Sequence, residues 1–364
     1  MIARLVRGLI CGLVLALGCR APKPTDVRPT VRLTGGTPCV AGLGRLINQQ
    51  AGLSDSRIVI IDPEAPAVLV IDCVAHRVDT LGRKGRGPGE YVRPVALSAK
   101  LGGGLVLLDG ATARLTMWDS ALRLISTVPV PAEFLEYQAA VDSRGNVYFT
   151  DPPAASPVFM GPADRAGRNP DSGLVYRALA GRFSTVDTVA EVIIRPADWI
   201  GHVAKLPRRF ADGDAWGIMP DGTFWIARSR ENRVDRIDPA GQLATGAALP
   251  WTPVPTTDRD VRMIPNIAGP PPDSIAWPMA KVKAPFDEAI ASVDGAVWVR
   301  MSHPAASDEQ DYAVFRPDGR PANALVSLPA GARVIHVGRT GVWVATQDSV
   351  GLTNVTRFSR PELH

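Results

Sequence analysis

Histidine is the residue type in this chain best suited to hold a metal ion, because imidazole nitrogen is a common zinc ligand. Four histidines precede the C-terminal one: His76, His202, His303 and His336. No H-x-H or H-x-x-E-H spacing links any two of them, so a shared metal would need ligands from distant segments. His202, His303 and His336 are the candidate ligands for one divalent metal, calcium or zinc. The alternative for each is a satisfied or solvated side chain, and no cofactor at all.

A glycine-rich stretch with basic residues, GRKGRGPGEY, covers residues 82–91. Its alternating glycines expose backbone N–H groups that are suited to an anion or to a partner. The residues that define this candidate loop are Arg83, Lys84, Arg86, Glu90 and Tyr91. It is neither a Walker A motif nor a dinucleotide site, since no Gly-Lys-Ser/Thr and no helical pattern follows. The alternative is a crossover between two repeats, anchored by Glu90 and Tyr91.

Other catalytic patterns are missing from the sequence. There is no G-x-S-x-G elbow and no Ser/His/Asp order of a hydrolase. Asp142, Asp221 and Asp294 do recur at equivalent positions. Asp stabilises turns by accepting hydrogen bonds from nearby backbone N–H groups, so this recurrence indicates turns and not catalysis.

The first 29 residues are predicted to be an export signal followed by a tether, and not part of the folded domain. Arg4 and Arg7 precede an apolar stretch too short to span a membrane, so residues 1–18 are predicted to be a signal peptide. The following Cys19 resembles the lipidated cysteine of bacterial lipoproteins, although the usual leucine of that motif is displaced by one position. Arg20, and not an Asp, follows the cysteine, and resemblance to envelope lipoproteins of diderm bacteria implies the outer membrane; secretion or a periplasmic location is the alternative. Residues 19–29 are Pro-rich and predict a stiff tether.

Two cysteines remain in the exported part of the chain, Cys39 and Cys73. A disulfide between them is permitted in an exported protein. Closing the 34-residue loop would stabilise the fold by roughly 3–4 kcal/mol in the chain-entropy model. Two separate buried thiols are the alternative.

These residues would be carried by a repeated hairpin. The clearest copy is residues 289–301, AIASVDGAVWVRM, with Asp-Gly between alternating apolar runs. Aligning the bulky residue after each turn gives six positions: Ile60, Leu107, Tyr148, Trp225, Trp298 and Trp343. The short gaps of 41–47 residues equal one four-stranded propeller blade. We interpret the three tryptophans as packing between blades.

A second hairpin follows each first one, and the sixth lacks its outgoing strand. The sequence therefore predicts an all-β fold over residues 30–361, a six-bladed β-propeller of four-stranded antiparallel blades. An N-terminal strand must close the ring so that no edge stays unpaired. Residues 29–35, PTVRLTG, are the predicted closing strand. Long insertions at residues 152–173, 190–214 and 250–285 are the predicted functional loops.

The loop residues Gly85, Gly87, Pro88, Gly89, Glu90 and Tyr91 carry a resemblance to a known family. They are similar to the G-x-G-x-GPGE-aromatic loop of exported bacterial six-bladed β-propeller proteins related to NHL repeats. The resemblance covers about residues 30–360. It implies the same fold and an extracytoplasmic location, and it implies no particular reaction.

Composition narrows the function further. The net charge is +4 and falls by two when Arg4 and Arg7 leave with the signal. No basic stripe with interleaved aromatics is present, so nucleic acid is not an expected partner. We expect a monomeric, membrane-tethered module, attached through its lipid only, that binds a protein or glycan-like partner. The alternative is a metal-dependent lyase or lactonase-like hydrolase with its site at the central channel.

Overall fold

The structure is a computed structural model. It describes residues 28–363 except 45–49, 63, 64, 66, 101, 132–138, 151–170, 201–203, 263–277, 306 and 309. The predicted signal peptide, Cys19 and His202 lie outside the described residues. Within the described part of the chain, no helix is long and apolar enough to cross a membrane.

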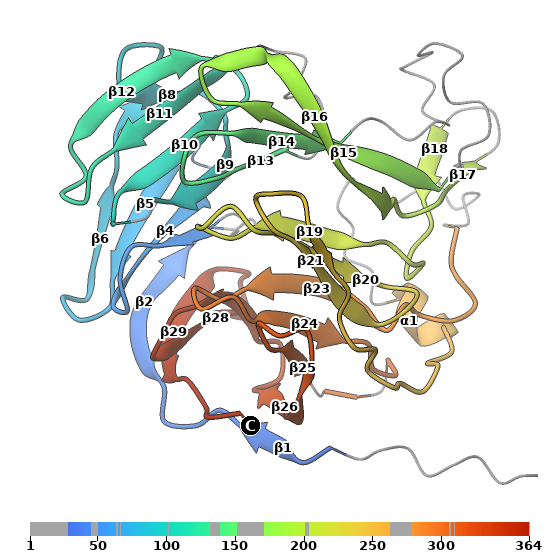
Figure 1. Ribbon diagram of the computed structural model, residues 1–364. Coiled ribbons are helices and arrows are strands. Elements are labelled where there is room, and N and C mark those ends of the chain that lie inside the picture. Colours follow the sequence, from blue (N-terminus) through green and yellow to red (C-terminus); the bar gives the residue numbers. More distant parts are fainter. Residues whose placement is uncertain are drawn as a thin grey trace, which may run out of the picture.

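The described chain is almost entirely β-structure, and four-stranded antiparallel blades follow one another around a ring (Figure 1). Blade I contains β3 (Gln50–Gly52), β4 (Arg57–Asp62), β5 (Ala67–Asp72) and β6 (Arg77–Thr80). Blade II contains β9 (Pro94–Ala99), β10 (Leu105–Asp109), β11 (Arg114–Trp118) and β12 (Leu124–Pro129). Blade III contains β13 (Ala139–Val141), β14 (Val147–Thr150), β15 (Ser172–Leu179) and β16 (Arg182–Ile193).

The second half of the ring repeats this order. Blade IV contains β19 (Ala215–Ile218), β20 (Phe224–Arg228), β21 (Arg233–Ile237) and β22 (Leu243–Ala244). Blade V contains β23 (Phe286–Ala291), β24 (Val297–Met301), β25 (Gln310–Phe315) and β26 (Pro321–Leu328). Blade VI contains β27 (Arg333–Val337), β28 (Gly341–Gln347) and β29 (Thr353–Ser359), completed by β2 (Thr37–Leu43). The predicted six-bladed propeller is therefore confirmed.

The hydrophobic core of the ring lies between the blades. The first strands of successive blades, β3, β9, β13, β19, β23 and β27, contact one another in a closed circle. Buried apolar side chains form six clusters, each shared by two consecutive blades. Trp225, Trp298 and Trp343 are buried in three of these clusters, which confirms that they pack between blades. A blade covered on both faces needs the near-continuous apolar strands found in the sequence.

The recurring aspartates stabilise turns, as the sequence predicts. The Asp142 carboxylate accepts hydrogen bonds from the backbone N–H of Arg144 at 2.8 Å and of Asn146 at 3.0 Å. Asp221 does the same for Thr223 at 2.8 Å. In blade V the turn also needs Gly295, whose φ of 88° is strained for any residue with a Cβ.

The strand that closes the ring is not the one predicted from the sequence. β2 (Thr37–Leu43) pairs antiparallel with β29, whereas residues 29–35 contribute β1 (Thr30–Arg32), which pairs parallel with β26 of blade V. Figure 1 shows β1 beside β26, outside the ring of blades. The β2 segment contains Pro38 and Gly42. An edge strand tolerates both residues, because one of its sides needs no ladder.

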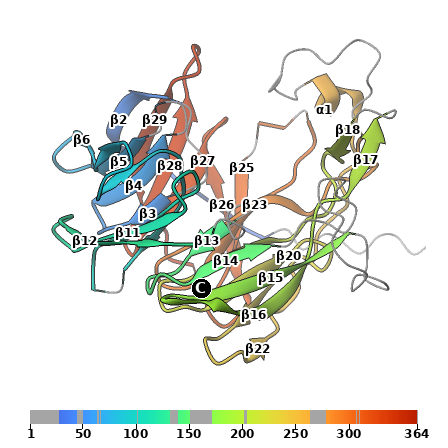
Figure 2. The same cartoon turned by 90° about the horizontal axis from the view of Figure 1, so that it is seen from above.

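The ring has two faces that carry different connections. The turns between the first and second strands of the blades define the turn face. The connections from one blade to the next, together with those between second and third strands, define the insertion face. The insertions supply a hairpin of β17 (Ala197–Ile200) and β18 (Ala204–Pro207), and the short helix α1 (Asp258–Arg262). These elements project beyond the blades at one side of the molecule (Figure 2).

Candidate functional site

The glycine-rich loop folds around one of its own carboxylates. It contains β7 (Arg83–Lys84) and β8 (Glu90–Tyr91), which pair in parallel. Glu90 accepts hydrogen bonds from the backbone N–H of Gly87 at 2.7 Å and from the Arg83 Nε at 2.6 Å. The Gly87 N–H and the Arg83 guanidinium lower the pKa of Glu90. The N–H groups that seemed suited to an external anion therefore already hold an internal one.

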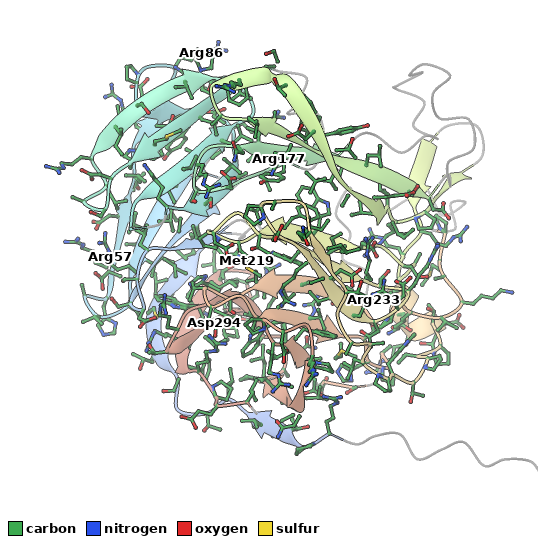
Figure 3. The ribbon with its side chains drawn as sticks, viewed as in Figure 1. Arg57, Arg86, Arg177, Met219, Arg233 and Asp294 are labelled. Carbon is green, nitrogen blue, oxygen red and sulfur yellow. A yellow bond between two sulfur atoms is a disulfide. The ribbon has the colours of Figure 1, made fainter. Side chains whose placement is uncertain are left out.

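Tyr91 fixes the same loop to blade I. Its buried hydroxyl accepts a hydrogen bond from the backbone N–H of Val68 at 3.0 Å. The arrangement agrees with the crossover interpretation, in which Glu90 and Tyr91 are anchors. Lys84 and Arg86 remain exposed. Figure 3 shows Arg86 at the outer edge of the ring and Met219 near its middle, so the loop does not reach the centre.

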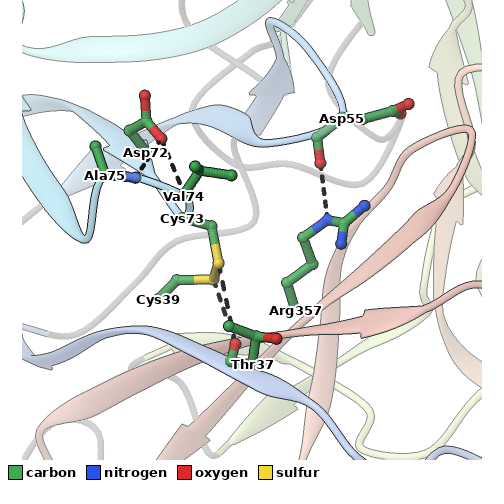
Figure 4. The surroundings of a disulfide bond; sticks show 8 residues. All are labelled: Thr37, Cys39, Asp55, Asp72, Cys73, Val74, Ala75 and Arg357. Atoms are coloured by element: carbon green, nitrogen blue, oxygen red, sulfur yellow. Dashed lines mark hydrogen bonds between the residues drawn. A yellow bond between two sulfur atoms is a disulfide. The ribbon is translucent and has the colours of Figure 1, made fainter.

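Cys39 and Cys73 are joined by a disulfide in the structure, with their Cα atoms 4.4 Å apart. Cys39 lies on β2 of blade VI, and Cys73 directly follows β5 of blade I. The bond therefore spans the seam at which the first and last blades meet (Figure 4). Disulfides persist in oxidising compartments, which agrees with the export that the sequence predicts.

The described candidate histidines lie at opposite ends of the ring. His336 lies near the end of β27, at the turn face. His303 follows the end of β24 at the insertion face, and its Nε2 is 3.7 Å from the Asp311 carboxylate. Among the residues the structure describes, no three His, Cys, Asp or Glu side chains are grouped to hold a metal. The structure therefore does not bring His303 and His336 together.

A chain of ion pairs crosses from blade V to blade VI at the insertion face. Arg300 makes a two-pronged contact with Asp287, at 2.7 Å and 2.9 Å. It also approaches Glu288 at 3.4 Å, and Arg333 approaches the other Glu288 oxygen at 3.8 Å. Burial raises the pKa of Glu288, against the opposing effect of the two arginines. Asp287 and Glu288 lie on the inner strand β23, so this chain borders the central channel.

Two arginines from an insertion extend this group. Arg195 follows β16, and its Cβ lies 3.3 Å from the position that a Cβ on Gly213 would take. Desolvation by the surrounding protein lowers the pKa of Arg195. The negative charge of Asp287 opposes this lowering, and the positive charge of Arg209 adds to it. The Arg195 side chain remains exposed. We call the following six residues the mouth cluster: Arg195, Arg209, Asp287, Glu288, Arg300 and Arg333. Their formal charges leave an excess of two positive charges at the insertion-face end of the channel.

A buried lysine holds the insertions against blade V, beside the mouth cluster. Lys283 donates hydrogen bonds to Asp260 of α1 at 2.5 Å and to the His303 backbone carbonyl at 2.7 Å. Its ammonium also lies 5.1 Å from the centre of the Phe210 ring. Lys283 thus contacts α1, the segment after β24 and the segment that contains Phe210. Removing one partner of a buried ion pair is costly, so we expect Lys283 to stabilise this arrangement.

Little in the sequence points to the mouth cluster. Its members come from an insertion and from three strand ends, and no short motif joins them. One available signal was Asp287-Glu288, a charged pair at the start of an inner strand whose other positions are apolar. An arginine is the expected partner of such a carboxylate pair. Only the packing of blade VI against blade V shows that Arg333 is one of these partners.

Known proteins resemble this chain in structure but not detectably in sequence. No family model matches this sequence, and no curated protein matches it. Among solved structures, a putative exported protein from Bacteroides fragilis is 9% identical with a TM-score of 0.49, covering 92% of this chain and 99% of its own. A gluconolactonase from Xanthomonas campestris is 14% identical, with a TM-score of 0.43 and coverages of 91% and 99%. The calcium-binding protein regucalcin from Agrobacterium tumefaciens is 11% identical, with a TM-score of 0.41 and coverages of 92% and 98%.

Proposed function

We propose that the protein is an extracytoplasmic binding module, tethered to the outer membrane through Cys19, that receives an acidic segment of a protein partner at the mouth cluster. The observation that supports this is the chain of ion pairs that Arg300 and Arg333 form with Asp287 and Glu288, with Arg195 near enough for Asp287 to act on its pKa. Complementary charge guides association and selects partners. The insertions on the same face supply additional surface for contact.

The two carboxylates of the mouth cluster pair with two of its arginines. Asp287 is paired with Arg300, whereas Glu288 stands between Arg300 and Arg333. A carboxylate of a partner would add to these pairs and balance the remaining positive charge. Arg195 is exposed, so it is available for such a contact without unfolding of the ring.

Calorimetric titration of the full-length protein in detergent with hexaglutamate tests this proposal. We expect binding that weakens at higher salt, because exposed charges are screened. Arg195→Gln together with Arg333→Gln should weaken it at least tenfold, which is about 1.4 kcal/mol. The matched control is Arg77→Gln together with Arg320→Gln, which removes two arginines outside the mouth cluster and should leave the affinity unchanged.

Equal binding of hexalysine, or unchanged binding in the Arg195/Arg333 variant, would contradict the proposal. Binding of hexagalacturonate in place of the peptide would identify a glycan as the partner. The metal-dependent enzyme predicted as the alternative stays a prediction. It would gain support from stoichiometric zinc or calcium in the purified protein that is lost with His303→Ala or His336→Ala.

A further inference from the structure

A second hollow region lies on the turn face, away from the mouth cluster and where blades I and VI meet. It consists of two adjoining cavities of about 230 Å³ and 420 Å³, which share Ser54 and Asp55 in their walls. His336 lines the smaller cavity, and the half-cystine Cys73 lines the larger one. We call the two together the seam recess. Its volume is in the range of small-molecule sites, roughly 300–1,000 Å³.

The wall of the seam recess holds a buried polar atom without a partner. His336 is only 6% exposed, and its Nε2 has no hydrogen-bond partner in the described structure. Buried polar atoms are nearly always hydrogen-bonded, so an orphaned one calls for an explanation. Neutral imidazole either donates or accepts at this nitrogen, according to its tautomer. A ligand hydroxyl satisfies both cases, because it is donor and acceptor at once.

The Asp55 carboxylate faces the same small space. The position that a Cβ on Gly338 would take lies 3.3 Å from Asp55 Oδ1 and 3.9 Å from His336 Nε2. Both polar atoms therefore lie on the side of Gly338 toward which a side chain would project, as does the Gly341 carbonyl oxygen at 3.4 Å. Asp55 is held in place, because its Oδ1 accepts the Arg339 N–H at 3.1 Å and its backbone carbonyl accepts Arg357 Nε at 2.8 Å.

Charge selects the class of ligand. Asp55 disfavours an anion, whereas Arg339 and Arg357 in the same walls disfavour a cation. The other wall groups include the hydroxyls of Ser54 and Ser56, the imidazole of His76 and the short apolar side chain of Val74. Mixed donors and acceptors beside apolar surface fit a molecule that carries hydroxyls on a carbon ring. We propose that the seam recess binds a neutral saccharide unit, with a hydroxyl placed between Asp55 and His336.

This site is independent of the mouth cluster, since the two lie on opposite faces and share no residue. Figure 4 shows Asp55, Arg357 and the Cys39–Cys73 disulfide around the seam. The wall residues come from both the first and the last blade. A ligand here therefore contacts both sides of the closure, and the site exists only in the closed ring.

Saturation-transfer NMR on the full-length protein in detergent tests the proposal. The probes are methyl α-D-glucopyranoside, methyl β-D-galactopyranoside and N-acetylglucosamine, with sodium phosphate and choline chloride as charged comparisons. We expect at least one saccharide to bind with a millimolar Kd and to bind more tightly than either charged probe. Asp55→Asn should weaken it at least fivefold, because an amide accepts hydrogen bonds less strongly than a carboxylate.

Gly338→Ala is the steric variant, because its methyl group projects toward Asp55 and His336. Gly338 is not among the positive-φ glycines, so alanine is compatible with its backbone. We expect Gly338→Ala to weaken saccharide binding at least fivefold with an unchanged melting temperature. Asp348→Asn, at an exposed turn outside the recess, is the matched control and should bind normally. Failure of all three saccharides to bind below 50 mM (roughly the weakest useful small-ligand affinity), tighter binding of phosphate or choline, or normal binding in both recess variants would overturn the proposal.

Discussion

His336 shows how burial sets the charge of a single residue. Its imidazole is enclosed by the inner strands of blades VI and I, and a Cβ on Gly52 would lie 2.3 Å from its Nε2. Burial lowers the pKa of His336 to about 4, although the negative charge of Asp55 opposes the shift. The side chain is therefore neutral at pH 7 and is available as a hydrogen-bonding group. Glu90 shows the opposite case, since hydrogen bonds to its ionised form lower its pKa.

The His336 shift predicts a loss of stability in mild acid. The unfolded chain takes up a proton at this histidine near pH 6.5, whereas the folded chain does so only near pH 4. The contribution is therefore complete above pH 6.5, and the free energy of unfolding falls by up to about 3 kcal/mol as the pH drops to 4. Urea denaturation at pH 7, 5.5 and 4 measures it. His336→Gln should flatten this part of the profile; a slope in that variant equal to the wild-type slope would refute the assignment.

At the scale of elements, β2 and the disulfide together seal the ring. β2 supplies the outer strand of blade VI, so the chain ends of the propeller meet within one sheet. The Cys39–Cys73 bond then ties that strand to the neighbouring blade I. By contrast, β1 adds three residues to the edge of blade V and closes nothing. Blade VI is built from two segments far apart in the chain, β2 and β27–β29, so both the β2–β29 pairing and the bond that holds β2 to blade I bear on closure of the ring.

Breaking the disulfide should therefore weaken the whole fold. We expect Cys39→Ser to lower the free energy of unfolding by roughly 3–4 kcal/mol, the value for a 34-residue loop. Urea denaturation of the oxidised protein and of the variant gives the difference. Wild-type protein with reductant should match Cys39→Ser, and reductant should not change the variant. An unchanged midpoint in Cys39→Ser would show that β2 pairing alone holds the seam.

At the scale of the whole molecule, the ring separates two surfaces. The insertion face carries the mouth cluster, the β17–β18 hairpin and α1, whereas the turn face carries the seam recess. A rigid ring positions both without large rearrangement, since each blade is packed on both faces. The predicted tether precedes β1 in the sequence, and β1 lies at the edge of blade V, so a lipid at Cys19 would hold the molecule from its rim.

Membrane attachment is testable on the whole protein. We expect Cys19→Ala to release the protein from the membrane fraction, because its lipid is the proposed anchor. Immunoblotting of soluble and membrane fractions after cell lysis measures this. Cys11→Ala, within the predicted signal peptide, is the matched control and should stay with the membrane. Retention of Cys19→Ala in the membrane fraction would exclude lipid attachment at that residue.

Local pattern alone was enough to predict the blades. The alternation of apolar residues, the Asp-Gly turns and the tryptophans of blades IV to VI depend on neighbours in the chain, so the number of blades and the inter-blade packing followed from the sequence. The turns of the Asp142 type and the anchoring role of Glu90 and Tyr91 could also be predicted from the sequence.

The closing strand could not be chosen from the sequence, because residues 29–35 and 37–43 satisfy the same local rules.

Tertiary structure decided which distant residues meet. His336 lies beside Asp55 only because the ring returns the last blade to the first, and Arg333 reaches Glu288 because blade VI packs against blade V. The spacing of residues in the sequence does not predict these contacts, since their members lie in different blades. The sequence determined the repeating sheet through short-range hydrophobic and turn chemistry. Both candidate sites arise from contacts between blades, and the seam recess depends in addition on closure of the complete ring.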